Sequence, residues 1–579
     1  MKSYNLLKVL LVAASVAVNA EEINKPAVRS SRNGRTSTGN TRKFIVEVEP
    51  VKKPVLSSHQ LLTLAESRHD HSDTPTPHET WSKKAFMEGV VNVWQAHKVA
   101  MPKVENSESG PSSSIRNYSI HHWTGVDKLH AAGIRGKGST VAIIDTGIDY
   151  THKATTKNYF ASPAAKNRQD PWETDEETIM QALCDAYNAG ADVITSSIGQ
   201  PNGWSDNPWA MLASRLVDKG VVVIASAGNE GEFGPFYSSS GAVGRGVLAV
   251  AAANVTTKPN ANRTGEDLGP LPVYFTTWGP TNELLLKPDI TAPGYMIMST
   301  VLNQSYEELS GTSMSAPYIA GIAALFVGQY GGRAFNGAGF AKMLRDRIAS
   351  SGTTLPFVNN RLMRKYKASP FQVGTGLVDA WKVLNYDTQL EYEPFSLMDT
   401  ELFRPRWSFN ITNTGGIAHE YTFKLEPQAG FNIYDPEYGV ALLYAIEPKN
   451  IVPPVRLPHR VLIEPGETRE LSGKVLINSD HGEKLAIPYG GAAYDTEKAF
   501  DNMFIVDPFV TDPDKDSAMR FAALRPYGNP NISDHWDVMN SPTASSIQVL
   551  PYNGTRNSTL KYRAPKYQTP SLGKGLLKG

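Results

Sequence analysis

The sequence predicts an α/β protein in which helices flank a parallel sheet, with a small α+β unit before it and a β-sandwich after it. From Tyr118 onward, short apolar stretches alternate with stretches of helical spacing, as in domains built around a buried parallel sheet. Beyond about residue 395, apolar side chains recur at every second position, which is typical of antiparallel strands. Ahead of both regions, residues 21–112 combine a few ordered stretches with polar ones.

Five apolar stretches of the α/β region are expected to form strands. They are 140–144, 192–197, 221–226, 247–252 and 273–277. Helices are expected at Glu176–Asn188 and Trp209–Asp218, because both have helical spacing and Pro208 and Gly220 bracket the second. The small-residue turn Gly311–Pro317 leads into an Ala-rich apolar helix that is expected to reach about Tyr330, where two glycines end it.

The N-terminal region is expected to carry a secretory signal. Within residues 1–20, lysines precede or flank the apolar stretch Leu10–Val18, and Val18-Asn19-Ala20 offers a small-residue cleavage site. Residues 21–112 are predicted to contain strands at 43–49 and 90–94 and a Leu-rich helix at 57–66, followed by a Ser-rich linker. These elements predict a small α+β unit.

The C-terminal region is expected to form a β-sandwich over residues 395–510. Its alternating stretches are 407–411, 421–425, 461–463 and 474–477, with Pro-Gly and Gly-Gly turns between them. Residues 511–579 are rich in Asp, Pro, Asn and Ser and show little periodicity, so an irregular tail is expected there.

Composition restricts the possible partners and the compartment. The 57 basic residues equal the 57 acidic ones, so we expect no nucleic-acid partner. No stretch after the signal is long and apolar enough to span a bilayer, so no membrane partner is expected. Cys184 is the only cysteine, which excludes intramolecular disulfides. Several Asn-x-Ser/Thr sequons agree with a secreted, extracellular glycoprotein.

Three polar residues follow or precede regular elements at places suited to catalysis. Ser313 lies at the first turn of the Ala-rich helix, where unpaired N–H groups and the helix dipole can stabilise a developing negative charge. Asp145 and Asn229 follow apolar strands, and functional residues of open α/β sheets gather at the carboxyl ends of strands. A serine before a helix is more commonly a cap, so Ser313 alone would not predict a nucleophile.

The motifs around these residues resemble those of the subtilisin-like serine proteases, or subtilases. Residues Gly311–Pro317 match the nucleophile pattern Gly-Thr-Ser-x-Ser/Ala-x-Pro at every position. Asp145-Thr146-Gly147 is similar to the aspartate motif, and Ala225–Gly231 is similar to the stretch that supplies the oxyanion-hole asparagine. The order of the three motifs is that of the family, and the domain order resembles large secreted fungal-type subtilases with a propeptide and a fibronectin type III-like domain.

The resemblance implies a role for each matched residue in a serine endopeptidase acting on proteins or peptides. Ser313 would be the nucleophile, Asp145 the carboxylate that orients the histidine, and Asn229 the oxyanion donor. The residues expected to flank the substrate are Ser197, Ile198, Gly199, Ala227 and Gly228. Residues 113–388 would form the peptidase domain, and residues 21–112 a propeptide that inhibits it intramolecularly as part of a zymogen. The chemistry requires no cofactor and no metal.

The chain departs from the family pattern at the histidine. The resemblance implies a His-Gly-Thr-His-type stretch on a helix between the Asp and Asn motifs, but only His152 occurs there, and we interpret it as a surface or loop residue. The family also has a strand and a helix where this chain has the polar stretch Lys153–Thr178. Two hypotheses follow: an endopeptidase whose sequence has lost a coding segment, or a catalytically dead secreted pseudoprotease that acts as a binding module. An α/β hydrolase is excluded, because no Gly-x-Ser-x-Gly elbow precedes a suitable Asp and His.

Overall fold

The computed structural model describes the chain in several stretches, to which all structural statements below refer. They are residues 44–48, 90–95, 98–100, 105–106, 120–149, 151–152, 173–255, 269–301, 304–359, 362–404, 406–431, 434–435, 439–440, 446–450, 457, 460–472, 476–491, 504–506 and 521–523. The expected signal peptide, the helix at 57–66 and most of the expected tail lie outside these residues. The chain divides into two compact units, one of residues 1–99 with 173–181 and one of residues 100–172 with 182–579.

The first unit contains the two strands expected near the N-terminus. Strand β1 (Phe44–Val48) pairs antiparallel with β2 (Val90–Gln95), with Ile45 opposite Trp94. Strands β3 (Lys98–Ala100) and β6 (Glu173–Asp175) form a second pair, and β6 runs into helix α4 (Glu176–Asn188). The bounds of α4 are those predicted from the helical spacing.

The second unit is built on a largely parallel sheet in the order β10-β9-β8-β7-β5, with β11 also paired to β9. Its strands are β5 (Val141–Ile144), β7 (Val193–Ser196), β8 (Val222–Ser226), β9 (Leu248–Asn254), β10 (Leu271–Pro272) and β11 (Ile290–Pro293). All neighbours are parallel except β10, which runs antiparallel to β9. The predicted α/β fold with a parallel sheet is therefore confirmed.

Two expectations about this sheet are wrong. Val273–Thr277 is a turn rather than a strand, because the Thr276 N–H donates to the Val273 carbonyl (3.1 Å) and the Thr276 hydroxyl accepts from the Ala252 N–H (3.0 Å). Strand β11, which also pairs with β9, was not predicted from the sequence. Strand β5 is only partly buried: among the described residues it pairs with β7 alone, and Ile143 is 64% exposed whereas Ile144 is buried.

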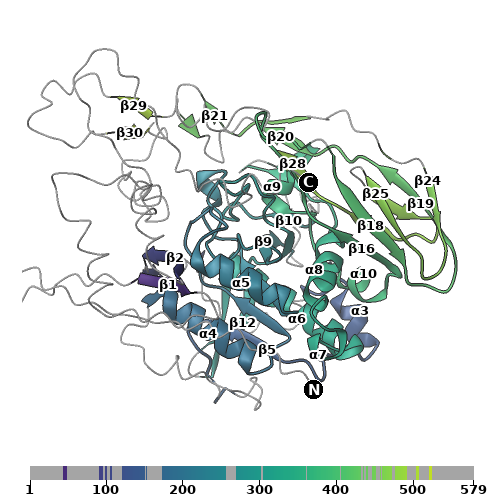
Figure 1. Cartoon of the computed structure of the whole chain (residues 1–579), viewed down its shortest axis with the longest axis horizontal. Helices are drawn as coiled ribbons and strands as arrows, with labels where there is room; N and C mark the ends of the chain where they lie inside the picture. The colour runs from purple at the N-terminus through teal and green to yellow at the C-terminus, as the bar shows by residue number, and fades with distance from the viewer. Residues whose placement is uncertain are drawn as a thin grey trace, which may run out of the picture. The chain divides into compact units, whose positions relative to one another are not determined.

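Helices cover the buried strands of this sheet (Figure 1). Helix α6 (Thr312–Tyr330) contacts β7, β8, β9 and β11, and α5 (Pro208–Asp218) and α8 (Phe340–Ser350) both contact β8. The Asn207 side chain caps α5 by accepting from the Ala210 N–H at 2.9 Å. The shorter helices are α3 (Val126–Ala131), α7 (Arg333–Asn336), α9 (Pro370–Val373), α10 (Ala380–Asn385) and the 3₁₀ helix η3 (Gly231–Phe233).

Two smaller sheets accompany the parallel one. Strands β12 (Ile297–Val301), β13 (Ser305–Ser310) and β4 (Glu105–Asn106) form an antiparallel sheet, and β13 leads into α6. Strands β14 (Pro356–Val358) and β15 (Leu362–Lys367) form a hairpin.

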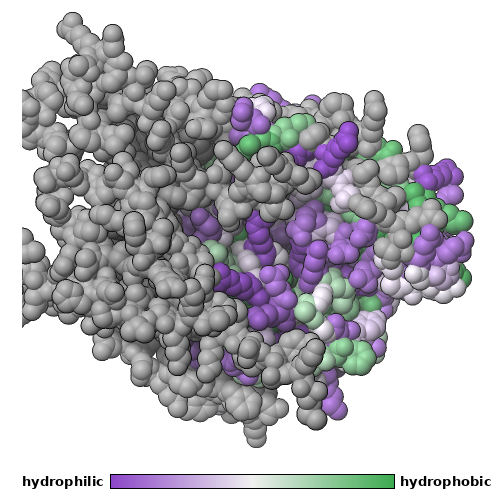
Figure 2. Space-filling model, viewed as in Figure 1, coloured by the Kyte–Doolittle hydropathy of each residue, from purple (hydrophilic) through white to green (hydrophobic). Residues whose placement is uncertain are grey.

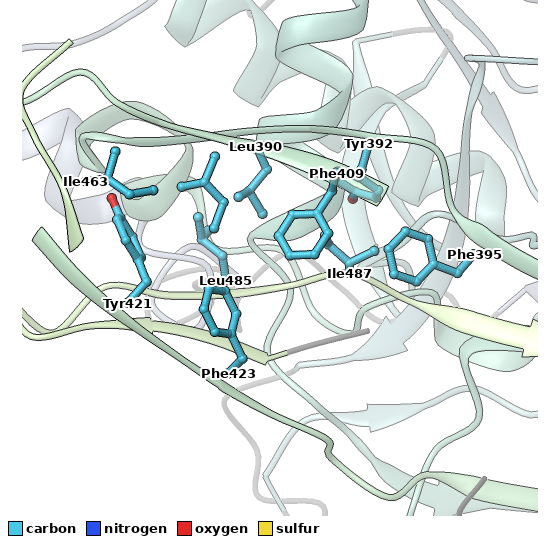
Figure 3. Packing of buried hydrophobic residues seen from close by; sticks show 10 residues of the cluster. Leu390, Tyr392, Phe395, Phe409, Tyr421, Phe423, Ile463, Leu485 and Ile487 are labelled. Atoms are coloured by element: carbon cyan, nitrogen blue, oxygen red, sulfur yellow. The ribbon is translucent and has the colours of Figure 1, made fainter. Parts of the chain in front are cut away.

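After α10 the chain forms two antiparallel sheets that share one hydrophobic cluster. One sheet has the order β16-β18-β25 and the other β24-β19-β26-β27. Their bounds are β16 (Thr388–Tyr392), β18 (Ser408–Asn413), β25 (Thr468–Ser472), β24 (Arg460–Ile463), β19 (His419–Lys424), β26 (Leu476–Ser479) and β27 (Lys484–Ala486). Buried Leu390 and Phe409 of the first sheet pack with Tyr421, Phe423 and Leu485 of the second, as Figure 3 shows. The expected stretches 407–411, 421–425 and 461–463 overlap β18, β19 and β24, and the described part of 474–477 lies in β26.

Four further strand pairs complete the described part of this region. They are β17 (Phe395–Met398) with β28 (Tyr489–Gly491), β20 (Ala429–Phe431) with β23 (Pro448–Asn450), β21 (Tyr434–Asp435) with β22 (Gly439–Val440), and β29 (Phe504–Val506) with β30 (Phe521–Ala523). No helix within the described stretches is both long and apolar enough to cross a membrane. On the face shown in Figure 2, hydrophobic side chains of the described residues are interspersed with hydrophilic ones.

Candidate active site

The carboxyl ends of three adjacent parallel strands bring the predicted site residues to one edge of the sheet. Ile144 of β5 lies opposite Ser196 of β7, and Ser196 lies opposite Ala225 of β8. Asp145 and Ser197 therefore leave neighbouring strands at the same level, and β8 continues at that edge into Ala227. Such an edge is where open α/β sheets place their ligands.

Ser313 is held at the start of α6 by a reciprocal contact with Ser197. The Ser313 hydroxyl donates to the Ser197 carbonyl at 3.3 Å, and the Ser197 hydroxyl donates to the Ser313 carbonyl at 2.9 Å. Pro317 explains the second bond, because it lies four residues after Ser313 and has no N–H to donate to that carbonyl. Ser197 thus replaces a helical hydrogen bond and ties the predicted nucleophile to the end of β7.

The Asn229 side chain is held by Thr312, a residue for which the sequence predicted no role. The Thr312 N–H and the Thr312 hydroxyl both donate to Asn229 Oδ1, each at 2.9 Å. Because two donors identify that atom as the oxygen, the other end of the amide is the NH₂ group. Thr312 is part of the Gly-Thr-Ser motif, but the spacing of the motifs does not predict which residue at a strand end a threonine at the start of a helix will contact.

The absence of a side chain at Gly311 leaves a space bordered by two N–H donors. An ideal Cβ built on Gly311 would lie 3.4 Å from Asn229 Nδ2 and 3.6 Å from the Ser313 backbone nitrogen. Both nitrogens therefore border the same small volume at the start of α6, and Met314 Sδ borders it too at 3.6 Å. Two N–H-bearing nitrogens around one volume at a helix N-terminus suit a developing oxyanion.

The other predicted substrate-flanking residues lie in tightly packed backbone around this point. The Gly228 N–H donates to the Thr312 hydroxyl at 3.2 Å, and a Cβ on Gly228 would lie 2.6 Å from both Glu230 and Thr277 side-chain oxygens. Ala227 bridges two segments, since its N–H donates to the Val250 carbonyl and its carbonyl accepts from the Ser239 N–H, each at 3.0 Å. The structure therefore places Ala227 and Gly228 next to Thr312 at the same sheet edge.

Ile198 and Gly199 continue the backbone beyond Ser197. Ile198 is buried. A Cβ on Gly199 would lie 1.8 Å from the Ser239 hydroxyl, so only glycine allows this approach. All five predicted substrate-flanking residues thus border the Ser313–Asn229 pair or the backbone next to it.

Asp145 lies at the same edge but in a different environment. Its side chain is exposed, and its Oδ1 accepts from the Thr146 N–H at 2.7 Å. Within the described residues no hydrogen bond joins Asp145 to Ser313.

His152 does not occupy that intermediate position. It belongs to the loop after β5, as expected, but it is only 3% exposed and therefore does not lie at the surface. Its Nε2 lies 3.2 Å from the Ser305 carbonyl at the start of β13, and its ring meets the edge of Tyr306. These contacts explain the burial of the ring.

His121 contacts α6 at a different point. Its Nδ1 lies 2.9 Å from the hydroxyl of Tyr318, and burial together with neighbouring His130 lowers the pKa of His121. Tyr318 comes five residues after Ser313, which places it about 7.5 Å further along the axis and roughly 140° around the helix. His121 therefore anchors the side of α6 that faces α3 and is not aimed at Ser313.

Comparison with known proteins gives this geometry a context. Residues 170–366 match the subtilase family. The matched segment includes Ser197, Asn229 and Ser313 and leaves Asp145 outside. Within the described residues, no three His, Cys, Asp or Glu side chains are grouped so that they could hold a metal ion.

Several proteases are similar to parts of the chain. A thermostable alkaline protease of Halalkalibacterium halodurans is 28% identical over 272 residues, which is 47% of this chain and 61% of that protein. Thermitase of Thermoactinomyces vulgaris is 34% identical over 175 residues, or 30% of this chain and 54% of thermitase. The PI-type proteinase of Lactococcus lactis subsp. cremoris is 25% identical over 331 residues, covering 53% of this chain and 16% of the proteinase. The chain thus spans less than two thirds of each, and together the matches support a subtilisin-like serine peptidase.

Proposed function

We propose that this chain is a secreted subtilisin-like serine endopeptidase that hydrolyses peptide bonds through an acyl-enzyme. The observation that carries the proposal is the pair of donors, Asn229 Nδ2 and the Ser313 N–H, that border one space at Gly311, two residues before Ser313. If Ser313 only capped the helix, it would need neither the Asn229 amide nor the fixed orientation of that amide. The subtilase match and the protease relatives support the same conclusion.

In the proposed reaction each residue acts through the contact described for it. Ser313 Oγ leaves the Ser197 carbonyl and attacks the carbonyl carbon of the substrate, and its proton passes to a base that Asp145 orients. The oxygen of the tetrahedral intermediate accepts from Asn229 Nδ2 and the Ser313 N–H. Loss of the amine gives the acyl-enzyme, which water hydrolyses by the reverse sequence of proton transfers.

The proposed substrate is an extended protein or peptide segment. Backbone at Ser197–Gly199 and at Ala227–Gly228 would flank it on two sides, as their placement beside Ser313 supports. Residues 1–20 would direct secretion, residues 21–112 would inhibit the enzyme until they are removed, and residues 395–510 would form a fibronectin type III-like domain. The two sheets that share the cluster around Phe409 support the last assignment.

The base is the component that this sequence does not supply. In subtilisin itself, loss of the histidine lowers turnover by about 10⁶, which corresponds to about 8 kcal/mol of transition-state stabilisation. Strand β5 is an edge strand whose Ile143 side chain is exposed. This supports the loss of a neighbouring segment, because an apolar parallel strand is normally covered on its faces and paired on both sides. We therefore infer that the functional enzyme contains a further stretch after His152.

Sequencing the transcript across codons 150–180 tests this inference. An in-frame stretch that encodes a histidine between His152 and Glu176 is the expected result. A transcript identical to the sequence shown here would contradict it and favour the second hypothesis, a secreted pseudoprotease acting as a binding module. The engagement of His152 with Ser305 is the observation that favours this alternative.

A fluorophosphonate probe distinguishes the two functions at the protein level. An active serine peptidase is expected to form a covalent adduct on Ser313, and Ser313→Ala is expected to abolish it. A folded protein from the complete transcript that remains unlabelled would be a pseudoprotease.

A further inference from the structure

The stretch of residues 197–207, here called the β7–α5 segment, connects the end of β7 to the start of α5. It begins with three of the proposed substrate-flanking residues and ends at Asn207, the cap of α5. One side of it is fixed to residues 238–240. The Ser240 N–H donates to the Gln200 carbonyl, and the Asn202 N–H donates to the Ser238 carbonyl, both at 2.9 Å.

The opposite side of the segment is fixed by Asn282 and Glu283, from the loop between β10 and β11. The Asn282 N–H donates to the Gly203 carbonyl at 2.8 Å. Glu283 Oε1 accepts from both the N–H and the hydroxyl of Ser205, at 2.8 and 2.9 Å. A single carboxylate oxygen thus holds two groups of one residue in the segment.

Glu283 is a buried acid with an incomplete set of partners. The residue is 8% exposed, and its second oxygen, Oε2, is buried without a hydrogen-bond partner. Burying a carboxylate is costly unless its oxygens are satisfied. A structural role alone does not explain this carboxylate, since a buried amide or hydroxyl would accept the hydrogen bonds of Ser205 at a lower cost in free energy.

The turn that carries Glu283 is rigidly mounted. The Thr281 N–H donates to the Leu285 carbonyl and the Leu285 N–H donates to the Thr281 hydroxyl, both at 3.0 Å. Leu284 is buried within this turn with a positive φ of 63°. The carboxyl therefore has a fixed position, and Ser205 must come to it.

The charge of Glu283 varies near neutral pH. Burial raises its pKa to about 7, and the nearby Asp206 carboxylate acts in the same direction, whereas the hydrogen bonds from Ser205 oppose the rise. Burial also raises the pKa of Asp206. Above neutral pH the carboxyl becomes charged, and its unpartnered oxygen then makes the closed arrangement less favourable.

We infer that Glu283 is a positioning residue that holds the β7–α5 segment, and through it Ser197–Gly199, in place for an extended substrate. The role of Glu283 in substrate binding rests on the proposed peptidase function, whereas its contacts with Ser205 do not depend on that function. Glu283 acts through Ser205 and does not touch the reacting atoms. Loosening Ser205 removes the fixed point between the anchored backbone at 200–203 and the cap at Asn207.

Hydrogen exchange followed by mass spectrometry on the full chain tests the positioning role without requiring catalysis. In Glu283→Ala, peptides covering residues 200–207 are expected to exchange about tenfold faster at pH 6 than in the unmodified chain. Glu283→Gln keeps an acceptor for Ser205 and is expected to restore protection. In the unmodified chain, protection should fall as pH rises through about 7, and in Glu283→Gln it should not.

One control variant and two contradicting outcomes give this experiment its specificity. Glu232→Ala, at an exposed glutamate of η3, is expected to exchange like the unmodified chain. Unchanged exchange at 200–207 in Glu283→Ala would overturn the inference. So would an equal increase over the whole chain in both Glu283 variants, because Glu283 would then support the fold in general.

A second readout connects the segment to substrate binding. A peptidyl phosphonate occupies the substrate-flanking backbone, whereas a simple alkyl fluorophosphonate reaches only Ser313. In Glu283→Ala the ratio of the two labelling rates at Ser313 is expected to fall about tenfold in favour of the alkyl probe, and an unchanged ratio would contradict the substrate-positioning role. If neither probe labels the unmodified chain, the proposed function fails while hydrogen exchange still decides the role of Glu283.

Discussion

Thr312 determines how the Asn229 amide is oriented. Both of its donors meet Asn229 Oδ1, so the NH₂ group is directed toward the space at Gly311. The motifs Gly311–Pro317 and Ala225–Gly231 were enough to predict Ser313 and Asn229 as partners, because each residue lies in a constrained stretch. It was not enough to predict Thr312, whose role depends on a contact between positions 83 residues apart.

Thr312→Val is expected to slow fluorophosphonate labelling of Ser313 about tenfold, since the variant loses one hydrogen bond that orients the amide. Thr312→Ser keeps the hydroxyl and should label at the original rate. Asn229→Ala removes the donor itself and should cost about 10²–10³ in rate. Equal rates in Thr312→Val and the unmodified chain, with both folded, would show that the amide needs no such support.

The pKa of Glu283 predicts how stability depends on pH. A carboxyl whose pKa is raised from 4.5 to about 7 on folding stabilises the fold below its unfolded pKa, and this contribution is lost as pH rises through about 7. The free energy of unfolding of the unmodified chain should therefore fall between pH 5 and pH 8, by at most about 3 kcal/mol from this group. Urea unfolding of Glu283→Gln should show a smaller fall over the same range. A parallel pH dependence in both proteins would exclude Glu283 as its source.

Most strands and helices around the site follow from their sequence patterns. Strands β7, β8 and β9 are apolar because both of their faces are buried, α4 and α5 have helical spacing, and α6 is an Ala-rich apolar stretch that two glycines end. Strand β11 escaped prediction because it has only four residues and ends in Pro293, so it lacks a periodic signal. The turn at 273–277 has the composition of a strand and is bent by long-range hydrogen bonds that no local pattern records.

Strand β5 is more exposed to solvent than its apolar sequence predicts. Ile143→Lys is expected to change the free energy of unfolding by less than about 0.5 kcal/mol, because the side chain is exposed. It should also reduce aggregation, since an inserted charge blocks edge-to-edge pairing. Light scattering and urea unfolding measure the two effects. Ile194→Lys, on neighbouring β7 and fully buried, should instead prevent stable folding.

A severe loss of stability in Ile143→Lys would contradict the open edge. It would mean that another segment covers this strand, as in a complete parallel sheet.

At the scale of the whole second unit, buried charges connect α8 to the first strand of the β region. Arg345 Nε lies 2.9 Å from Asp346 Oδ1, and both side chains are almost wholly buried. Arg345 Nη2 donates to the Tyr392 carbonyl at 3.1 Å, and Asp346 Oδ2 accepts from the Tyr392 N–H at 3.3 Å. The sequence could not predict this junction, since periodicity identifies α8 and β16 separately but gives no information on which polar groups meet.

Asp346→Ala is expected to cost about 3–5 kcal/mol of stability, because it leaves the Arg345 guanidinium buried with a weaker set of partners. Lys342→Ala on the same helix removes only exposed ion pairs with Glu391 and Glu393 and should cost less than about 1 kcal/mol. Urea unfolding followed by fluorescence measures both. Similar small losses in the two variants would show that the buried pair does not contribute to the junction.

The proposed serine peptidase function is tested most directly by locating, with mass spectrometry, a fluorophosphonate adduct on the protein made from the complete transcript. We expect an adduct on Ser313 that forms at least a hundredfold more slowly in Asn229→Ala. A folded protein that carries no adduct on Ser313, or one whose labelling rate is indifferent to Asn229, would contradict it.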